Sequence, residues 1–166
     1  MENLKAVASM IRYGARSLAH NLTFIPEDRA HWKPEPTAKS PMEIACEVTR
    51  ALTMYRPILD SPDFPERPEL SLQPATLAEA AQQLRATAEE YAAALENAGP
   101  ELDRPQAMPF GGVFLASRAV CYPLLDIFQH HGQICYLQSL LGDAEMHWDA
   151  EAIEAEFAWK GDPQHA

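Results

Sequence analysis

The chain has 166 residues, which is enough for one domain with a hydrophobic core and short for two. Its hydrophobic share of 47% and charged share of 22% are those of an ordinary globular protein and exclude a disordered or fibrous chain. The net charge of −11 repels the phosphates of nucleic acids, so we expect no nucleic-acid partner.

Prolines divide the chain into four long segments. Proline lacks a backbone N–H and interrupts helices, so groups of prolines indicate connections between elements. Such groups fall at 26–41, 57–74 and 100–109. In the first segment, apolar residues from Leu4 to Leu22 recur at helical spacing, which predicts a helix.

The second and third segments each open with the pattern of a helix start. In "SPME", Ser40 can cap the helix, a proline occupies the first helical position, and Glu43 completes a capping box. In "TLAE", Thr76 can cap the helix and Glu79 can complete a capping box. Behind each cap, apolar residues recur every three or four positions, which predicts two amphipathic helices, the second ending before Gly99.

The fourth segment covers about residues 117–141 and stops at Gly142, a residue type that often follows a helix end. Pro123 near its start predicts a kink or an irregular first turn. Apolar residues point in nearly every direction around this segment, which predicts a helix in the centre of the protein. A short fifth helix is expected from Asp149 to Trp159.

These segments together predict an all-α fold, a four-helix bundle with long connections and a short C-terminal helix. No long stretch alternates apolar and polar residues as a strand would. We expect a single domain over residues 1–166, with a core at about 1–142 and a C-terminal extension at 143–166.

The cysteines and the N-terminus indicate the compartment. Cys46, Cys121 and Cys135 are odd in number and form no close pairing motif, which is typical of a reducing compartment. The start "MENLKAVASMIRYGAR" lacks the pattern of a signal peptide, and no stretch reaches the roughly 18–20 apolar residues of a membrane span. We therefore expect a cytoplasmic protein with no membrane partner.

The fourth segment carries polar side chains within an apolar helix. His130 lies about 40° from Asp126 and Gln133 about 20° on the other side, so the three share one stripe, whereas His131 points about 140° away. A buried polar stripe needs partners, because unpaired polar groups are costly to bury. Two interpretations are open: a hydrogen-bonded core pair, or a divalent metal bound by Asp126, His130 and a ligand from another helix.

The stretch "TFIPEDRAHWKPEPTAKSPMEIACEVTR" is followed about 80 residues later by "FQHHGQICYLQSLLG". Their order and spacing resemble the DinB-like superfamily of four-helix bundles. The matching features are the "IPED…W…P" end of the first helix, the serine-led second helix and the His-Gly-Gln signature of the fourth. The resemblance covers about residues 1–142.

In this superfamily three histidines commonly bind zinc or nickel, one in the second helix and two in the fourth. The resemblance places these positions on Cys46, Asp126 and His130, so only one histidine remains. All three residue types are competent metal ligands, and the resemblance gives His131 and Gln133 the task of orienting them. Alternatively, the site has decayed, and Cys46 is a small buried apolar residue.

The resemblance also implies an activity. DinB-like proteins include transferases and isomerases that use a low-molecular-weight thiol and a small electrophile, and they imply a homodimer here. We therefore expect a metal-dependent thiol transferase or isomerase in which Cys46, Asp126 and His130 converge in one pocket. The alternative is a metal-free bundle that binds a small ligand or a protein through its residual cavity.

Overall fold

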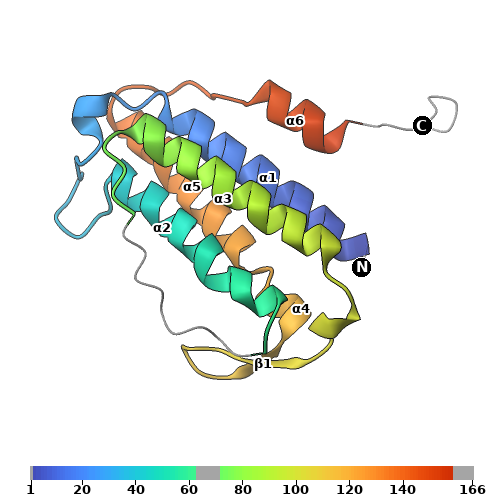
Figure 1. Ribbon diagram of the computed structural model, residues 1–166. Helices are drawn as coiled ribbons and strands as arrows, with labels where there is room; N and C mark the ends of the chain where they lie inside the picture. Colours follow the sequence, from blue (N-terminus) through green and yellow to red (C-terminus); the bar gives the residue numbers. More distant parts are fainter. Residues whose placement is uncertain (1, 63–71, 159–166) are drawn as a thin grey trace, which may run out of the picture.

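The computed structural model describes residues 2–62 and 72–158 and confirms the all-α prediction (Figure 1). Four long helices form the body of the molecule: α1 (Glu2–Leu22), α2 (Pro41–Tyr55), α3 (Leu77–Asn97) and α5 (Tyr122–Leu140). The shorter elements are 3₁₀ helices at Glu27–Arg29, Arg56–Leu59 and Pro100–Leu102, strands β1 (Pro105–Ala107) and β2 (Val113–Leu115), and helices α4 (Ala116–Ala119) and α6 (Ala150–Phe157).

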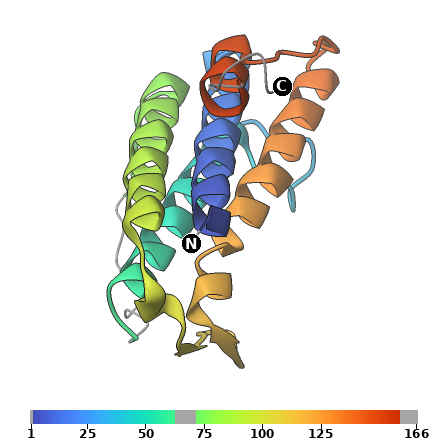
Figure 2. The ribbon, with the colours of Figure 1, turned by 90° about the vertical axis from the view of Figure 1, so that its right-hand side faces the viewer.

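The long helices pack in a square. Helix α1 packs mainly against α3 and α5, and α2 packs mainly against the same two helices. Helices α1 and α2 therefore lie across a diagonal, and in Figure 2 α1 lies in front of α2, between α3 and α5. In Figure 1, α2 and α3 run in one direction and α1 and α5 in the other. The α2–α5 side of the square carries the candidate site.

The predicted caps are present at α2 and α3. Ser40 Oγ accepts a hydrogen bond from Glu43 N at 3.2 Å, and Glu43 Oε2 accepts one from Ser40 N at 2.8 Å. Thr76 Oγ1 likewise accepts from Glu79 N at 3.1 Å, but the Glu79 carboxylate accepts from Ala75 N instead of from the cap residue. These bonds satisfy backbone donors at the helix starts and fix where α2 and α3 begin.

The predicted apolar stripes of α1, α2 and α3 form the core. Their buried members are Ile11, Leu18 and Leu22 from the first segment, Ala45, Val48, Leu52, Tyr55 and Leu59 from the second, and Leu77, Ala81, Leu84, Ala88, Tyr91 and Leu95 from the third. Because α2 turns this stripe inward, residues on its flanks, Glu47 among them, lie beside the neighbouring helix or the surface.

The fourth predicted helix is interrupted close to Pro123. Helix α4 ends at Ala119, and α5 begins at Tyr122 with Pro123 in its first turn. The Tyr91 hydroxyl donates a hydrogen bond to Val120 O at 2.8 Å, which satisfies a carbonyl at the break.

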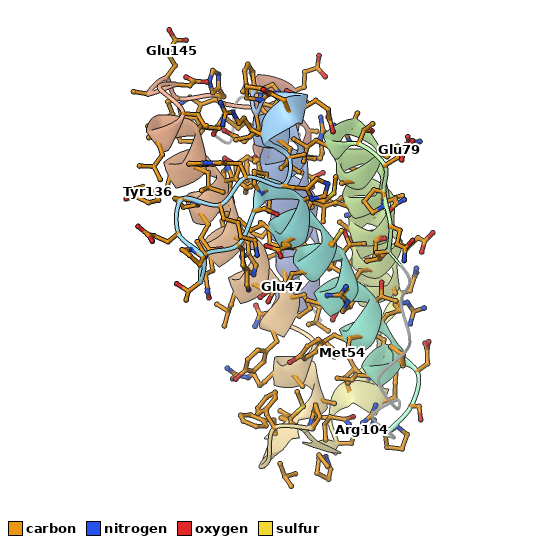
Figure 3. The ribbon with its side chains drawn as sticks, turned by 90° about the vertical axis from the view of Figure 1, so that its left-hand side faces the viewer. Glu47, Met54, Glu79, Arg104, Tyr136 and Glu145 are labelled. Atoms are coloured by element: carbon orange, nitrogen blue, oxygen red, sulfur yellow. The ribbon has the colours of Figure 1, made fainter. Side chains whose placement is uncertain are left out.

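One face of α5 is apolar and exposed, which corrects the prediction that this helix is central. Leu125 and Tyr136 expose 67% and 64% of their surface, and Figure 3 shows Tyr136 on the outer side of α5. The helix occupies a corner of the square, so only part of its apolar surface has a partner within the chain. The exposed residues Leu125, Phe128, Tyr136 and Leu140 are called the α5 outer stripe below.

A small hairpin before α4 was not predicted. Strands β1 and β2 pair antiparallel, and the turn between them contains Gly111 and Gly112 with φ of 96° and 87°. Such positive φ values favour glycine. The hairpin carries Phe110 and Phe114 to the end of the bundle where α2 stops and α5 starts.

The expected short C-terminal helix is present as α6. Asp149 Oδ1 accepts a hydrogen bond from Ala152 N at 2.9 Å and so caps the helix. The expected end at Trp159, and the rest of the predicted extension, lie outside the described residues. Within the part of the chain that the structure describes, every helix is too short or too polar to cross a bilayer.

Candidate functional site

Asp126 and His130 lie one turn apart where α5 meets α2. The Nε2 atom of His130 is 3.5 Å from Oδ1 of Asp126. The His130 side chain is almost fully buried, with 1% exposed, whereas 31% of the Asp126 side chain is exposed. The two residues that the sequence placed on one stripe therefore form a pair at the edge of the core.

Gln133 fixes the orientation of the His130 ring. The Nδ1 atom of His130 lies 2.6 Å from Oε1 of Gln133. Because an amide oxygen only accepts, Nδ1 carries the hydrogen and donates it. In the neutral ring Nε2 then keeps its lone pair, and this lone pair is the one next to Asp126.

Glu47, from α2, is the third member of this cluster. Its Oε2 atom lies 3.7 Å from Nε2 of His130, and Figure 3 shows Glu47 at the boundary between α2 and α5. The same carboxylate forms an ion pair with Lys39, which precedes the cap of α2. Glu47, Asp126 and His130 are called the Glu–Asp–His cluster below.

The surroundings of Asp126 disfavour the negative charge of its carboxylate. Burial raises the pKa of Asp126, the neighbouring His130 opposes the rise, and Glu47 adds to it. Its Oδ2 atom is buried and has no hydrogen-bond partner among the described residues. A buried acceptor without a donor is costly, so a cation or a proton at this point would relieve the cost.

Cys46 stands apart from the cluster. It lines a cavity of about 510 Å³ beside the loop that leads into α2, and Asp126 lines an adjoining cavity of about 400 Å³; Glu47 and Arg50 line both. Neighbouring helix residues point about 100° apart, so α2 turns Cys46 away as it turns Glu47 toward His130. Burial raises the pKa of the Cys46 thiol, and the nearby Arg50 opposes the rise. The structure thus brings together Asp126 and His130 and leaves out Cys46.

His131 faces α1 and does not touch the cluster. Its Nε2 atom lies 3.2 Å from Nδ2 of Asn21, an amide that donates, so Nε2 accepts. Burial lowers the pKa of His131, which keeps the ring neutral. Of the two residues expected to orient ligands, Gln133 contacts His130 and His131 instead joins α5 to α1.

Two properties of the cluster, its side-chain groups and two of its distances, bear on the binding of a divalent cation. Imidazole and carboxylate are both zinc ligands, and ligand atoms about 2.0–2.1 Å from a tetrahedral zinc lie about 3.3 Å from one another. The distances from His130 Nε2 to the two carboxylates, 3.5 and 3.7 Å, are close to this spacing. As the side chains stand, no three His, Cys, Asp or Glu among residues 2–62 and 72–158 form a ready metal group. Glu47, the third donor, is engaged by Lys39.

Sequence reasoning missed Glu47 and Lys39. Both lie within a few residues of the predicted ligand Cys46, but only the rotation of α2 about its axis decides which flank faces α5. The start of α2 at Ser40 and its apolar stripe carry that signal. They place Glu47 on a flank of the core-facing stripe, 100° from Cys46.

A comparison of the chain with protein-family models and with curated proteins finds no match in either. The geometry of the Glu–Asp–His cluster is therefore the basis for assigning a function.

Proposed function

We propose that the chain binds a divalent metal, zinc or nickel, through Glu47, Asp126 and His130. One observation carries the proposal: Nε2 of a buried imidazole lies 3.5 and 3.7 Å from two carboxylates, one of which has a buried oxygen without a donor among the described residues. Three electron-rich groups in contact repel one another unless a positive charge lies between them. Resemblance to the DinB-like superfamily supports a metal site at the same position, with Glu47 as the ligand in place of Cys46.

The ligand set determines what such a metal would do. Two carboxylates and a neutral imidazole cancel a +2 charge, so the bound ion would supply a weak Lewis acid with a coordination position open to water or a thiol. Gln133 holds the His130 ring in the tautomer that exposes Nε2. Lys39 competes for Glu47 and would be displaced when Glu47 turns inward.

We infer an activity from the same resemblance. A thiol-dependent transferase or isomerase needs room for a low-molecular-weight thiol and a small electrophile next to the metal. The cavity of about 400 Å³ that Glu47 and Asp126 line offers such room. Its sides come from α2 and the first turns of α5, so both reactants would enter beside the cluster.

Zinc titration of variants tests the ligand set. Isothermal titration of the metal-free protein should give one zinc per chain, and His130→Ala should lower the affinity by at least about 100-fold. Glu47→Gln should also weaken binding, whereas Cys46→Ala, the neighbouring position on the same helix, should not change it. Circular dichroism of each variant checks that the helices are intact.

The outcomes separate the alternatives. A loss of zinc in Cys46→Ala equal to that in His130→Ala would restore the ligand set expected from the resemblance. Absence of zinc and nickel binding by the unaltered protein would favour the metal-free bundle that binds a small ligand or a protein.

We also propose that the chain is a cytoplasmic homodimer joined through the α5 outer stripe. The stripe exposes four apolar side chains on one side of α5, whereas the whole chain carries a net charge of −11 that keeps copies apart. The same stripe on two copies can pair about a twofold axis. The three cysteines are free, in keeping with a reducing compartment.

A further inference from the structure

The cavity next to Asp126 extends well beyond the Glu–Asp–His cluster. It follows one face of α2 from Glu47 to Tyr55, a span of about 12 Å at 1.5 Å per residue. The first turns of α5 form the opposite wall. Its lining residues are Glu47, Arg50, Ala51, Met54, Tyr55, Tyr122, Pro123 and Asp126. The cavity is therefore long enough for an elongated small molecule that reaches from the cluster to the end of α2.

Arg50 supplies a positive charge to this cavity and also lines the neighbouring cavity of about 510 Å³. It is half-buried and makes no ion pair or hydrogen bond with any described residue. Arg12 and Arg56, in contrast, pair with Glu89 and Asp60. Arg85 and Arg118 also have no such partner among the described residues, but they are exposed. A guanidinium that faces a cavity without a partner matches the planar, two-oxygen geometry of a carboxylate.

The end of the cavity away from the cluster is aromatic. The rings of Tyr55 and Tyr122 stack with centroids 5.9 Å apart and an angle of 13° between their planes. Phe110 and Phe114 from the hairpin contact the Tyr122 ring, with centroids 5.7 and 6.3 Å away. Met54 lies further along α2 than Glu47, as Figure 3 shows. This end suits an apolar or aromatic group.

We infer that the cavity binds a monocarboxylate with an aromatic or apolar body. Arg50 would receive the carboxylate, and Met54, Tyr55 and Tyr122 would contact the body. The carboxylates of Glu47 and Asp126 lie at the same end of the cavity as Arg50 and disfavour a second negative charge on the ligand. Because Arg50 lies one turn from Glu47, the atoms next to the ligand's carboxylate face the cluster. Any reaction of such a ligand rests on the proposed function. The binding of the ligand is tested independently of that function.

Titration with 3-phenylpropionate and its uncharged amide, 3-phenylpropanamide, tests this inference. Calorimetry would use the full chain, both zinc-loaded and treated with chelator. The acid should bind at least about tenfold more tightly than the amide, because a charge-assisted hydrogen bond contributes that much. Arg50→Gln should remove this preference. Arg56→Gln, which changes the same charge two turns further along the chain but outside this cavity, should retain it.

The two proposals fail separately. A preference for the acid that depends on Arg50 supports the carboxylate site, and it does so even if the chain binds no zinc. Equal affinity for acid and amide, or an acid affinity unchanged in Arg50→Gln, overturns the carboxylate site even if zinc binds normally. The comparison of acid with amide on the unaltered protein keeps the test decisive if Arg50→Gln does not fold.

Discussion

The negative charge of Asp126 has few stabilising partners in the fold. Burial raises its pKa, and its Oδ2 atom lacks a donor among the described residues. A group whose pKa is raised by folding favours the folded state at acid pH, and this contribution is lost as the pH rises through the raised pKa. In the metal-free chain Asp126 is therefore a destabilising residue at neutral pH.

The effect of Asp126→Asn on stability should have opposite signs in the absence and in the presence of the metal. Without metal, the variant should be more stable to urea at pH 7 by about 1 kcal/mol, because a neutral amide replaces a poorly solvated carboxylate. The gain should shrink as the pH falls through the raised pKa of Asp126, because the carboxylate of the unaltered chain then becomes protonated. With saturating zinc the variant should be the less stable protein, since it loses the stabilisation that binding gives. The same change in stability with and without zinc would count against Asp126 as a ligand.

Gln133→Ala should weaken zinc binding by about 10–100-fold without removing a ligand. The amide oxygen of Gln133 holds Nδ1 of His130 at 2.6 Å, and loss of this bond frees the ring to turn and to change tautomer. Gln129→Ala is the control, because Gln129 lies on the exposed side of the same helix. Equal zinc affinities of the two variants, measured by competition with a chromogenic chelator, would rule out an orienting role for Gln133.

The site was predictable within one helix and not between helices. Asp126, His130 and Gln133 follow from helical spacing alone, because residues three and four apart share a face. The third group depends on how α2 is rotated and shifted against α5; the capped start and apolar stripe of α2 indicate its core-facing side but not its position along α5. Cys46 and Glu47 are neighbours in the chain, yet only Glu47 approaches His130.

Helices α1 and α5 approach closely at Gly14. A Cβ atom at this position would lie 2.7 Å from Cγ2 of Ile127, a branch that is fixed near the backbone of α5. Gly132, in contrast, has open space where a Cβ atom would be. The two glycines therefore have different physical roles within helices, where glycine otherwise costs stability.

Substituting the two glycines should give opposite results. Gly14→Ala should lower the free energy of unfolding by about 1–2 kcal/mol, because overpacking outweighs the gain in helix propensity. Gly132→Ala should raise it by about 0.5–1 kcal/mol. Urea denaturation at a concentration where the chain is monomeric provides both values. Stabilisation by Gly14→Ala would show that α1 and α5 are less tightly packed than the structure indicates.

Helices whose starts carry a capping residue or a proline were predictable from the sequence. Elements without such residues were not. The caps at Ser40 and Thr76 marked two helix starts, and Pro123 marked the irregular start of α5. The β1–β2 hairpin has strands of only three residues, too short for an alternating pattern to stand out. The position of α5 at a corner of the bundle was not predictable from its composition, because an all-round apolar helix fits a core and a subunit interface equally well.

The α5 outer stripe should govern the oligomeric state of the whole molecule. Sedimentation equilibrium at micromolar concentration should give a mass twice the 18.5 kDa of the chain. Tyr136→Glu should give the monomer, because it places a charge within a surface that pairs with itself. Val113→Glu, at a residue that is 68% exposed on the hairpin, should remain dimeric. A monomeric unaltered chain would refute the dimer, and a monomeric Val113→Glu would move the interface to the hairpin.

The square arrangement of the helices also bears on synthesis at the ribosome. Helices α1 and α2 are consecutive in the sequence but lie across a diagonal, and both pack mainly against α3 and α5. A nascent chain that has released only α1 and α2 has few partners for either apolar stripe. Those stripes stay uncovered until α3 emerges, and incomplete chains with uncovered apolar surface aggregate readily. The interval before α3 leaves the exit tunnel is therefore when this chain has most need of a chaperone.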